Sequence, residues 1–123
     1  MDYRKLNAAT VPDPFPLPYM DSILDDVVGH EMYSFLDGFS GYNQIGMAPE
    51  DQAKTAFITA WGVFVCTVMW FRLRNAPSTF QRDMVKIFGP FLLDFMQIIL
   101  DDLIIFSGQA KHLKHLCLCF AKC

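Results

Sequence analysis

The segment from Met96 to Ser107, MQIILDDLIIFS, places two adjacent carboxylates between two runs of branched apolar residues. Apolar runs of this length that flank a short polar dipeptide are typical of two buried strands joined by a tight turn. The segment therefore predicts a hairpin with Asp101 and Asp102 at its turn. The rest of the chain can be interpreted around this hairpin.

Two functional interpretations of the acidic pair are open. Two negative charges this close repel each other and lose solvation, so such a pair is tolerated where a cation, often a divalent metal, neutralises it. Asp is also a common turn residue, so the pair could instead form a solvent-exposed turn that binds nothing. The segment alone does not separate a metal site from an acidic turn.

The composition indicates a folded chain with a surplus of apolar surface. Of the 123 residues, 53% are hydrophobic and 12 are Phe, which excludes a disordered segment. The surplus suggests that part of the surface meets another domain or partner. The formal net charge of -3 excludes a global basic field of the kind that binds nucleic acid, so local clusters must decide.

We expect the chain to stay out of membranes. The apolar region from Phe88 to Phe106 is interrupted by Gly89-Pro90, Asp94 and the acidic pair, which is too polar for a membrane span. The N-terminal MDYRKLN lacks the basic-then-apolar pattern of a signal segment. These features predict an intracellular protein, either cytoplasmic or nuclear.

The first thirty residues predict three short segments. Residues 2–11 are typical of a strand end that enters a turn, and four alternating prolines in residues 12–18 predict a stiff, extended connector. Asp21 and Ser22 are then expected to cap a short helix that Gly29 ends.

A short strand is predicted from Met32 to Leu36, with Asp37 at its end. A Gly-rich turn follows and leads to Tyr42. A carboxylate at a strand end beside such a turn is a frequent site geometry, because the backbone there is uncrowded.

The middle of the chain predicts a hairpin and a helix. Residues 48–52 should form a polar loop, and 54–59 and 63–69 should form two strands around a Trp61-Gly62 turn. Asn75 and Pro77 then open a helix that Gly89-Pro90 ends.

A final amphipathic helix is predicted near the C-terminus. Its apolar positions are expected to be Leu113, Leu116, Cys117 and Phe120.

Three carboxylates stand out, namely Asp37 at the end of one strand and Asp101 with Asp102 at the hairpin. If the strands are neighbours, the three could share metal ions. Two divalent ions held by carboxylates stabilise both the attacking and the leaving oxygen of a phosphoryl displacement. Mg²⁺ suits such a site because it prefers oxygen ligands and bridges substrate phosphates.

Six collinear motifs resemble the central part of reverse transcriptases of the Ty3/gypsy class of LTR retrotransposons, particularly those of plants. They are DYRKLN (2–7), FPLPYMDSIL (15–24), FLDGFSGYNQI (35–45), PEDQAKTAF (49–57), NAPSTFQR (75–82) and LDDLIIFS (100–107). The resemblance implies an α+β fingers-palm fragment with a ferredoxin-like palm, in which helices flank an antiparallel sheet. It also implies an RNA-directed DNA polymerase, a nucleotidyltransferase, from a retrotransposon polyprotein.

The resemblance divides the chain into four parts. Residues 1–11 would be a remnant of the fingers, and 12–44 would be palm with the first catalytic motif. Residues 45–74 would be a fingers insertion. Residues 75–123 would be palm again, with the motif helix, the catalytic hairpin and the final helix.

The resemblance also implies a role for individual residues. Asp37, Asp101 and Asp102 would be the catalytic ligands of two Mg²⁺ ions, with Mn²⁺ as an alternative metal. Tyr42, which could instead be a packed aromatic under a turn, would exclude a nucleotide 2'-hydroxyl. Nucleotide contacts would come from Tyr42, Phe71 and Gln81, and template-primer contacts from Asn75, Arg82 and Ile99.

Three positions depart from the family pattern. The family usually has VMPFGL where residues 68–73 replace the Pro with Trp70 and the Gly with Arg72. Both changes add bulk beside the expected nucleotide site, so Arg72 should block the pocket or displace the loop, or else contact phosphate. Ile99 replaces a usual Tyr or Phe and removes an aromatic contact near the primer end.

The expected partners are an RNA or DNA template-primer and deoxynucleoside triphosphates. Relative to the family, the thumb, connection and RNase H domains are missing from this sequence, so we expect the fragment to be inactive by itself. The alternative is a catalytically dead retroelement relic, or a non-enzymatic palm module that binds nucleic acid or protein.

Overall fold

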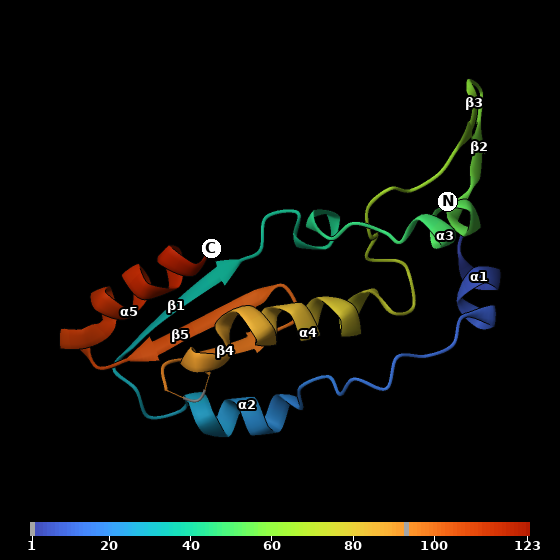
Figure 1. Ribbon diagram of the computed structural model, residues 1–123. Coiled ribbons are helices and arrows are strands. Elements are labelled where there is room, and N and C mark those ends of the chain that lie inside the picture. Colours follow the sequence, from blue (N-terminus) through green and yellow to red (C-terminus); the bar gives the residue numbers. More distant parts are fainter. Residues whose placement is uncertain (1, 93) are drawn as a thin grey trace.

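The computed structural model describes residues 2–92 and 94–123 and shows an α+β fold (Figure 1). A three-stranded antiparallel sheet has the order β1-β5-β4, formed by β1 (Met32–Asp37), β5 (Asp102–Ser107) and β4 (Met96–Ile99). A separate two-stranded hairpin extends away from this sheet. In the described part of the chain, no helix is long and apolar enough to cross a membrane.

The hairpin predicted from residues 96–107 is confirmed, and its second strand lies at the centre of the sheet. β5 pairs with β4 on one side and with β1 on the other. Both faces of a central strand are covered, which explains its unbroken LIIF run. One detail of the prediction is wrong, because Asp102 begins β5 and the turn contains only Leu100 and Asp101.

Helices cover both faces of the sheet. On one face, α4 (Ala76–Phe88) and α5 (Gln109–Lys122) pack on a core that includes Met96, Leu103 and Ile105. On the other face, Ile23 of α2 (Met20–Val27) packs against Ile104 and Phe106. Because side chains alternate along a strand, Asp102 lies on the same face of β5 as Ile104.

The apolar face predicted for the final helix is wrong at three of its four positions, whereas Leu116 is half-buried and packs on the core as predicted. Leu113 is 74% exposed and Phe120 is 58% exposed, whereas His112 and Cys119 are buried. The imidazole of His112 is hydrogen bonded through its two nitrogens to the hydroxyls of Ser34 and Ser107, each at 2.8 Å. A polar residue therefore occupies an inward position of α5 that the hydrophobic pattern did not reveal.

The predicted middle hairpin exists but is shorter than expected, with β2 (Phe57–Thr59) pairing with β3 (Gly62–Phe64). The predicted loop at 48–52 instead contains a short helix, α3 (Pro49–Gln52), which continues into the 3-10 helix η2 (Ala53–Thr55). Proline at the start of α3 fits a helix, because its ring fixes a helical φ and its missing N–H is not needed there.

The N-terminal segment is helical, so the predicted strand end is wrong. Residues Arg4–Ala9 form α1. Tyr3, just before α1, is buried, and its hydroxyl donates a hydrogen bond of 3.1 Å to the carbonyl oxygen of Thr55. The predicted cap of the next helix is also wrong, because α2 already begins at Met20 and its first position has no side-chain cap.

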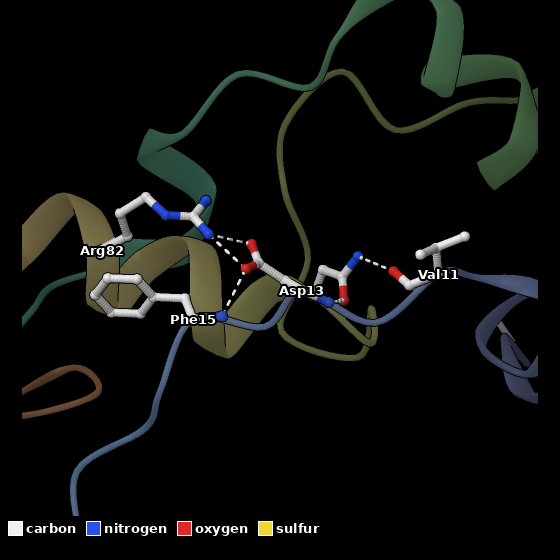
Figure 2. Close-up of polar contacts among 5 residues, drawn as sticks. Val11, Asp13, Phe15 and Arg82 are labelled. Atoms are coloured by element: carbon white, nitrogen blue, oxygen red, sulfur yellow. Dashed lines mark hydrogen bonds and ion pairs between the residues drawn. The ribbon is translucent and has the colours of Figure 1, made fainter.

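The proline-rich connector predicted at residues 12–18 lies in no helix or strand, and its contacts with Arg82 attach it to α4 (Figure 2). The carboxylate of Asp13 accepts a hydrogen bond of 2.9 Å from the backbone N–H of Phe15. It also forms an ion pair with Arg82, with N–O distances of 2.5 and 2.6 Å. The Arg82 guanidinium lies 5.1 Å from the centroid of the Phe15 ring.

These contacts predict a pH dependence of folding stability. The Phe15 N–H and the Arg82 guanidinium lower the pKa of Asp13 below its ordinary value. A carboxyl with a lowered folded-state pKa contributes stability above its unfolded pKa of about 3.9, and this stability is lost as the pH falls through the folded-state pKa. Urea unfolding at about pH 6 and about pH 3 should therefore show a larger stability loss in the wild-type chain than in Asp13→Asn.

Asp25→Asn, which changes an exposed carboxylate of α2, is the matched control for this measurement. It should retain the wild-type difference between the two pH values. An Asp13→Asn variant with the wild-type difference would show that the Asp13 contacts do not contribute to stability.

Candidate active site

The ends of β1 and β5 bring two of the predicted carboxylates together. Asp37 and Asp102 are directly opposite each other in the antiparallel register, so their side chains lie on the same face of the sheet. Both residues are exposed. The adjoining turn approaches the end of β1, because the backbone N–H of Gly38 donates a hydrogen bond of 2.8 Å to the carbonyl oxygen of Asp101.

A small cavity of about 200 Å³ opens between this turn and the segment that follows β1. Four of the predicted site residues line it, namely Asp37, Tyr42, Phe71 and Asp101. The structure therefore gathers residues from three distant parts of the sequence around one cavity, with two carboxylates and two aromatic rings in its wall.

The Gly-rich turn lets Tyr42 reach the cavity. A Cβ atom on Gly41 would lie 2.7 Å from the ring of Phe80, so only glycine fits this approach of the backbone to α4. The Tyr42 ring lies 4.9 Å from the Phe80 ring, centroid to centroid. Burial and the nearby Asp101 carboxylate raise the pKa of Tyr42. Tyr42 is thus both a packed aromatic and part of the cavity wall.

Gln81 holds the turn that carries Asp101. Its side chain is 5% exposed, and its Oε1 accepts a hydrogen bond of 3.0 Å from the backbone N–H of Leu100. Its Nε2 donates a hydrogen bond of 3.3 Å to the carbonyl oxygen of Ile98. Leu100 has a φ of 55°, a left-handed conformation that is unfavourable for leucine. The predicted contact of Gln81 with a nucleotide stays a prediction.

Two residues predicted to contact nucleic acid, Asn75 and Arg82, hold the N-terminal segment in this structure. Asn75 accepts a hydrogen bond of 2.9 Å from the backbone N–H of Asp13 and donates one of 2.8 Å to the carbonyl oxygen of Val11. Arg82 pairs with Asp13. Contacts of both residues with a template-primer stay predictions.

The other predicted nucleic-acid contact, Ile99, is half-buried against the cluster of Ile104 and Phe106. Its packing there anchors the end of β4 on the α2 face of the sheet.

Trp70 and Arg72, two of the departures from the family pattern, flank Phe71, which forms part of the cavity wall. Phe71 is 59% exposed, and the Arg72 guanidinium lies 5.6 Å from the centroid of its ring. Arg72 therefore places a positive charge beside this wall. Blocking of the pocket by Arg72 stays a prediction.

The three carboxylates do not form a metal site by themselves. In residues 2–92 and 94–123, no three His, Cys, Asp or Glu side chains are grouped closely enough to hold a metal ion. Mg²⁺ is commonly bound through one or two carboxylates together with waters and substrate phosphates. Asp37 and Asp101, which line the same cavity, fit this kind of shared site.

Comparison with known sequences identifies the family of this chain. The sequence model of the family described as "Reverse transcriptase (RNA-dependent DNA polymerase)" matches residues 1–123. The Pol polyprotein from transposon 297 of Drosophila melanogaster is 44% identical over 123 residues, which are 99% of this chain and 12% of the relative. The Pol polyprotein from transposon gypsy of the same organism is 36% identical over 117 residues, 94% of this chain and 11% of the relative.

A plant relative has a length close to that of the chain. The RNA-directed DNA polymerase homolog of Oenothera berteroana is 34% identical over 120 residues, which are 94% of this chain and 84% of the relative. The chain spans about an eighth of the transposon polyproteins that it matches.

Solved structures show the same fold. The foamy viral protease-reverse transcriptase in complex with RNA/DNA hybrid has a TM-score of 0.88 at 23% sequence identity, and the match covers 98% of this chain and 16% of that chain. The same viral protein in complex with double-stranded DNA has a TM-score of 0.87. The α+β fold predicted from the sequence is therefore confirmed.

Proposed function

This chain belongs to the reverse transcriptase family, and we propose that it forms the part of an RNA-directed DNA polymerase that holds the incoming deoxynucleotide. The transposon relatives support the predicted Ty3/gypsy class. Under this proposal the three-stranded sheet with α2, α4 and α5 is the palm. The β2–β3 hairpin and the segments around it belong to the fingers.

The observation that carries the proposal is the cavity that Asp37 and Asp101 share with Tyr42 and Phe71. The two carboxylates would hold a divalent cation, with Asp102 beside Asp37 on the same face of the sheet. Bound Mg²⁺ would stabilise the attacking and leaving oxygens during phosphoryl transfer. Two ions and three ligands are the full set that we propose.

The aromatic residues of the cavity would select and orient the nucleotide. Tyr42 is held by its packing on Phe80, so a ring in this position can exclude a 2'-hydroxyl by contact with the sugar. Phe71 would form the wall against the base and the sugar, because apolar ring surface suits an aromatic base.

The proposed partner is a template-primer duplex, because structural neighbours were solved with RNA/DNA hybrid and with double-stranded DNA. Affinity for such duplexes depends mainly on positive charges along the phosphate backbone. With a net charge of -3, this chain would need basic surfaces elsewhere in a longer polyprotein. The exposed rings of Phe35 and Phe39 would provide apolar contacts for such further domains.

A catalytically dead relic is the second candidate. It is favoured by the carboxylates, which do not form a three-ligand group in the described residues, and by Trp70, Arg72 and Ile99 in place of the family residues. A relic of this kind would retain the fold without binding Mg²⁺ and nucleotide together.

Ligand-dependent melting separates the two candidates. We expect the melting temperature to rise when Mg²⁺ and dATP are added together, because a ligand that binds only the folded state stabilises it by about 2.7 kcal/mol at a hundredfold excess over Kd. Circular dichroism at constant ionic strength measures this shift. Asp37→Asn should lose this shift, because the proposed metal site loses one of its three carboxylates.

Asp51→Asn changes a carboxylate of α3 that pairs with Lys54, away from the cavity, and is the control. It should keep the ligand-dependent shift. A wild-type chain without any shift, or an Asp37→Asn variant with the full shift, would contradict the proposed site.

A further inference from the structure

Two asparagine side chains join the N-terminal segment to the loop before α4, and they do so reciprocally. Asn7 donates a hydrogen bond of 2.9 Å from Nδ2 to the carbonyl oxygen of Arg72, and its Oδ1 accepts one of 2.9 Å from the backbone N–H of Arg74. Asn75, on the loop side, makes the equivalent pair of bonds to Val11 and Asp13. Each carboxamide thus bridges residues i and i+2 of the opposite segment.

This bridge has a specific chemical requirement. A carboxamide carries a donor and an acceptor side by side, so it can pair with a carbonyl oxygen and an N–H of one extended backbone. Aspartate would retain the acceptor for the N–H of Arg74 but would place a second oxygen against the carbonyl of Arg72. Alanine at position 7 would lose both bonds.

The loop that Asn7 holds also carries Phe71, which lines the cavity. Phe71 is 59% exposed, so burial in a core does not fix its ring. The hydrogen bonds of Asn7 fix the backbone at Arg72, the next residue, whose guanidinium lies over the Phe71 ring. The Arg74 guanidinium strengthens the junction, because it donates hydrogen bonds of 3.2 and 3.3 Å to the carbonyl oxygens of Asn7 and Thr10.

We propose that Asn7 is a positioning residue for the nucleotide cavity. Its carboxamide fixes the position of Phe71 in the cavity wall, while Asn7 itself does not line the cavity. The inference rests on the proposed function, since the ligand is a deoxynucleoside triphosphate whose base and sugar contact Phe71. The N-terminal segment thereby becomes a determinant of nucleotide affinity, although it lies outside the group of carboxylates.

The test compares nucleotide affinity with local backbone protection in this chain. The amide signals of Tyr42 and Phe71 are monitored by NMR during a titration with dATP and Mg²⁺. Hydrogen exchange at the Arg74 amide reports on its hydrogen bond to Asn7. Asn7→Ala should weaken dATP binding by roughly tenfold, because the loop that carries Phe71 loses the two hydrogen bonds of Asn7, and should speed exchange at Arg74. Amides of β5 should exchange as in the wild-type chain.

Two further variants act as controls. Asn7→Asp retains the acceptor for Arg74, so its dATP affinity should lie between those of wild type and Asn7→Ala, and this variant also decides the test if Asn7→Ala does not fold. Arg4→Ala changes an exposed residue of the same helix, whose side chain pairs with Asp2, and should leave the affinity and the exchange at Arg74 unchanged.

The outcomes separate the inference from the proposed function. If Asn7→Ala exchanges faster at Arg74 but binds dATP as the wild-type chain does, the positioning role is wrong while the proposed function stands. If Asp101→Asn binds dATP with Mg²⁺ as tightly as the wild-type chain, the proposed site is wrong and the inference falls with it.

Discussion

Replacing Asp101 with Asn is expected to reduce primer extension by about a hundredfold to a thousandfold, the effect typical of removing one group that stabilises charge developing in a transition state. Asn has nearly the shape of Asp, so the turn and its bond to Gly38 should persist. The charge that would hold a divalent cation in the cavity is lost, and a neutral amide oxygen is a weaker ligand for Mg²⁺. The fold of the turn should therefore persist, while cation binding in the cavity and the chemistry that depends on it should fail.

The assay needs a longer polypeptide that contains this chain together with the flanking parts found in its relatives. Extension of a labelled primer on an RNA template is measured in the natural sequence and in a background with Trp70→Pro and Arg72→Gly, which restores the usual family residues. Asp25→Asn in α2 is the charge-matched control and should extend the primer normally.

Each outcome of the comparison between the natural sequence and the restored background leads to a different conclusion. Primer extension at the wild-type level by the Asp101→Asn variant would contradict the catalytic assignment of the hairpin. Extension only in the restored background would show that Trp70 and Arg72 inactivate the natural chain. No extension in either background would favour the catalytically dead relic.

The hairpin of β4 and β5 could be predicted because its pattern lies within one short segment of the sequence. The MQIILDDLIIFS segment predicts its hairpin because β5 is buried on both faces and therefore reads as a continuous apolar run. α5 was predicted as a helix, but three of the four residues predicted for its apolar face are exposed. Its inward residue His112 is satisfied by hydroxyls of Ser34 and Ser107, and these tertiary partners leave no trace in the local pattern.

The candidate site was predictable only in part, for a related reason. The carboxylates Asp37 and Asp101 were identified from motifs, and the structure places both beside one cavity. Asn7 lies in the DYRKLN motif, but the motif itself does not indicate that Asn7 holds the loop that carries Phe71. Asn7, Gln81 and Asn75 bond to backbone atoms of distant segments. Any residue supplies such atoms, so the sequence carries no signature of the partner.

Gln81→Met is expected to lower the free energy of unfolding by about 2 kcal/mol, because the backbone N–H of Leu100 and the carbonyl of Ile98 lose their partner in a buried place. Methionine keeps the length of the side chain, so little cavity cost is added. Urea unfolding measures the change. Gln97→Met, at a half-buried residue of the same hairpin, removes an exposed hydrogen bond to Asp26 and should cost less than about 0.5 kcal/mol.

Leu100→Gly shows whether Gln81 acts through the backbone of the turn. A left-handed φ costs a residue with a Cβ about 1 to 2 kcal/mol, and glycine adopts it freely. When Gln81 is replaced, Leu100 can relax to a negative φ and carry Asp101 away from the cavity, whereas a glycine at this position can keep the original turn. The double variant should therefore recover the melting shift with Mg²⁺ and dATP that Gln81→Met loses. If Gln81→Met keeps the full shift, Asp101 does not depend on this bond, and Gln81 contributes to stability alone.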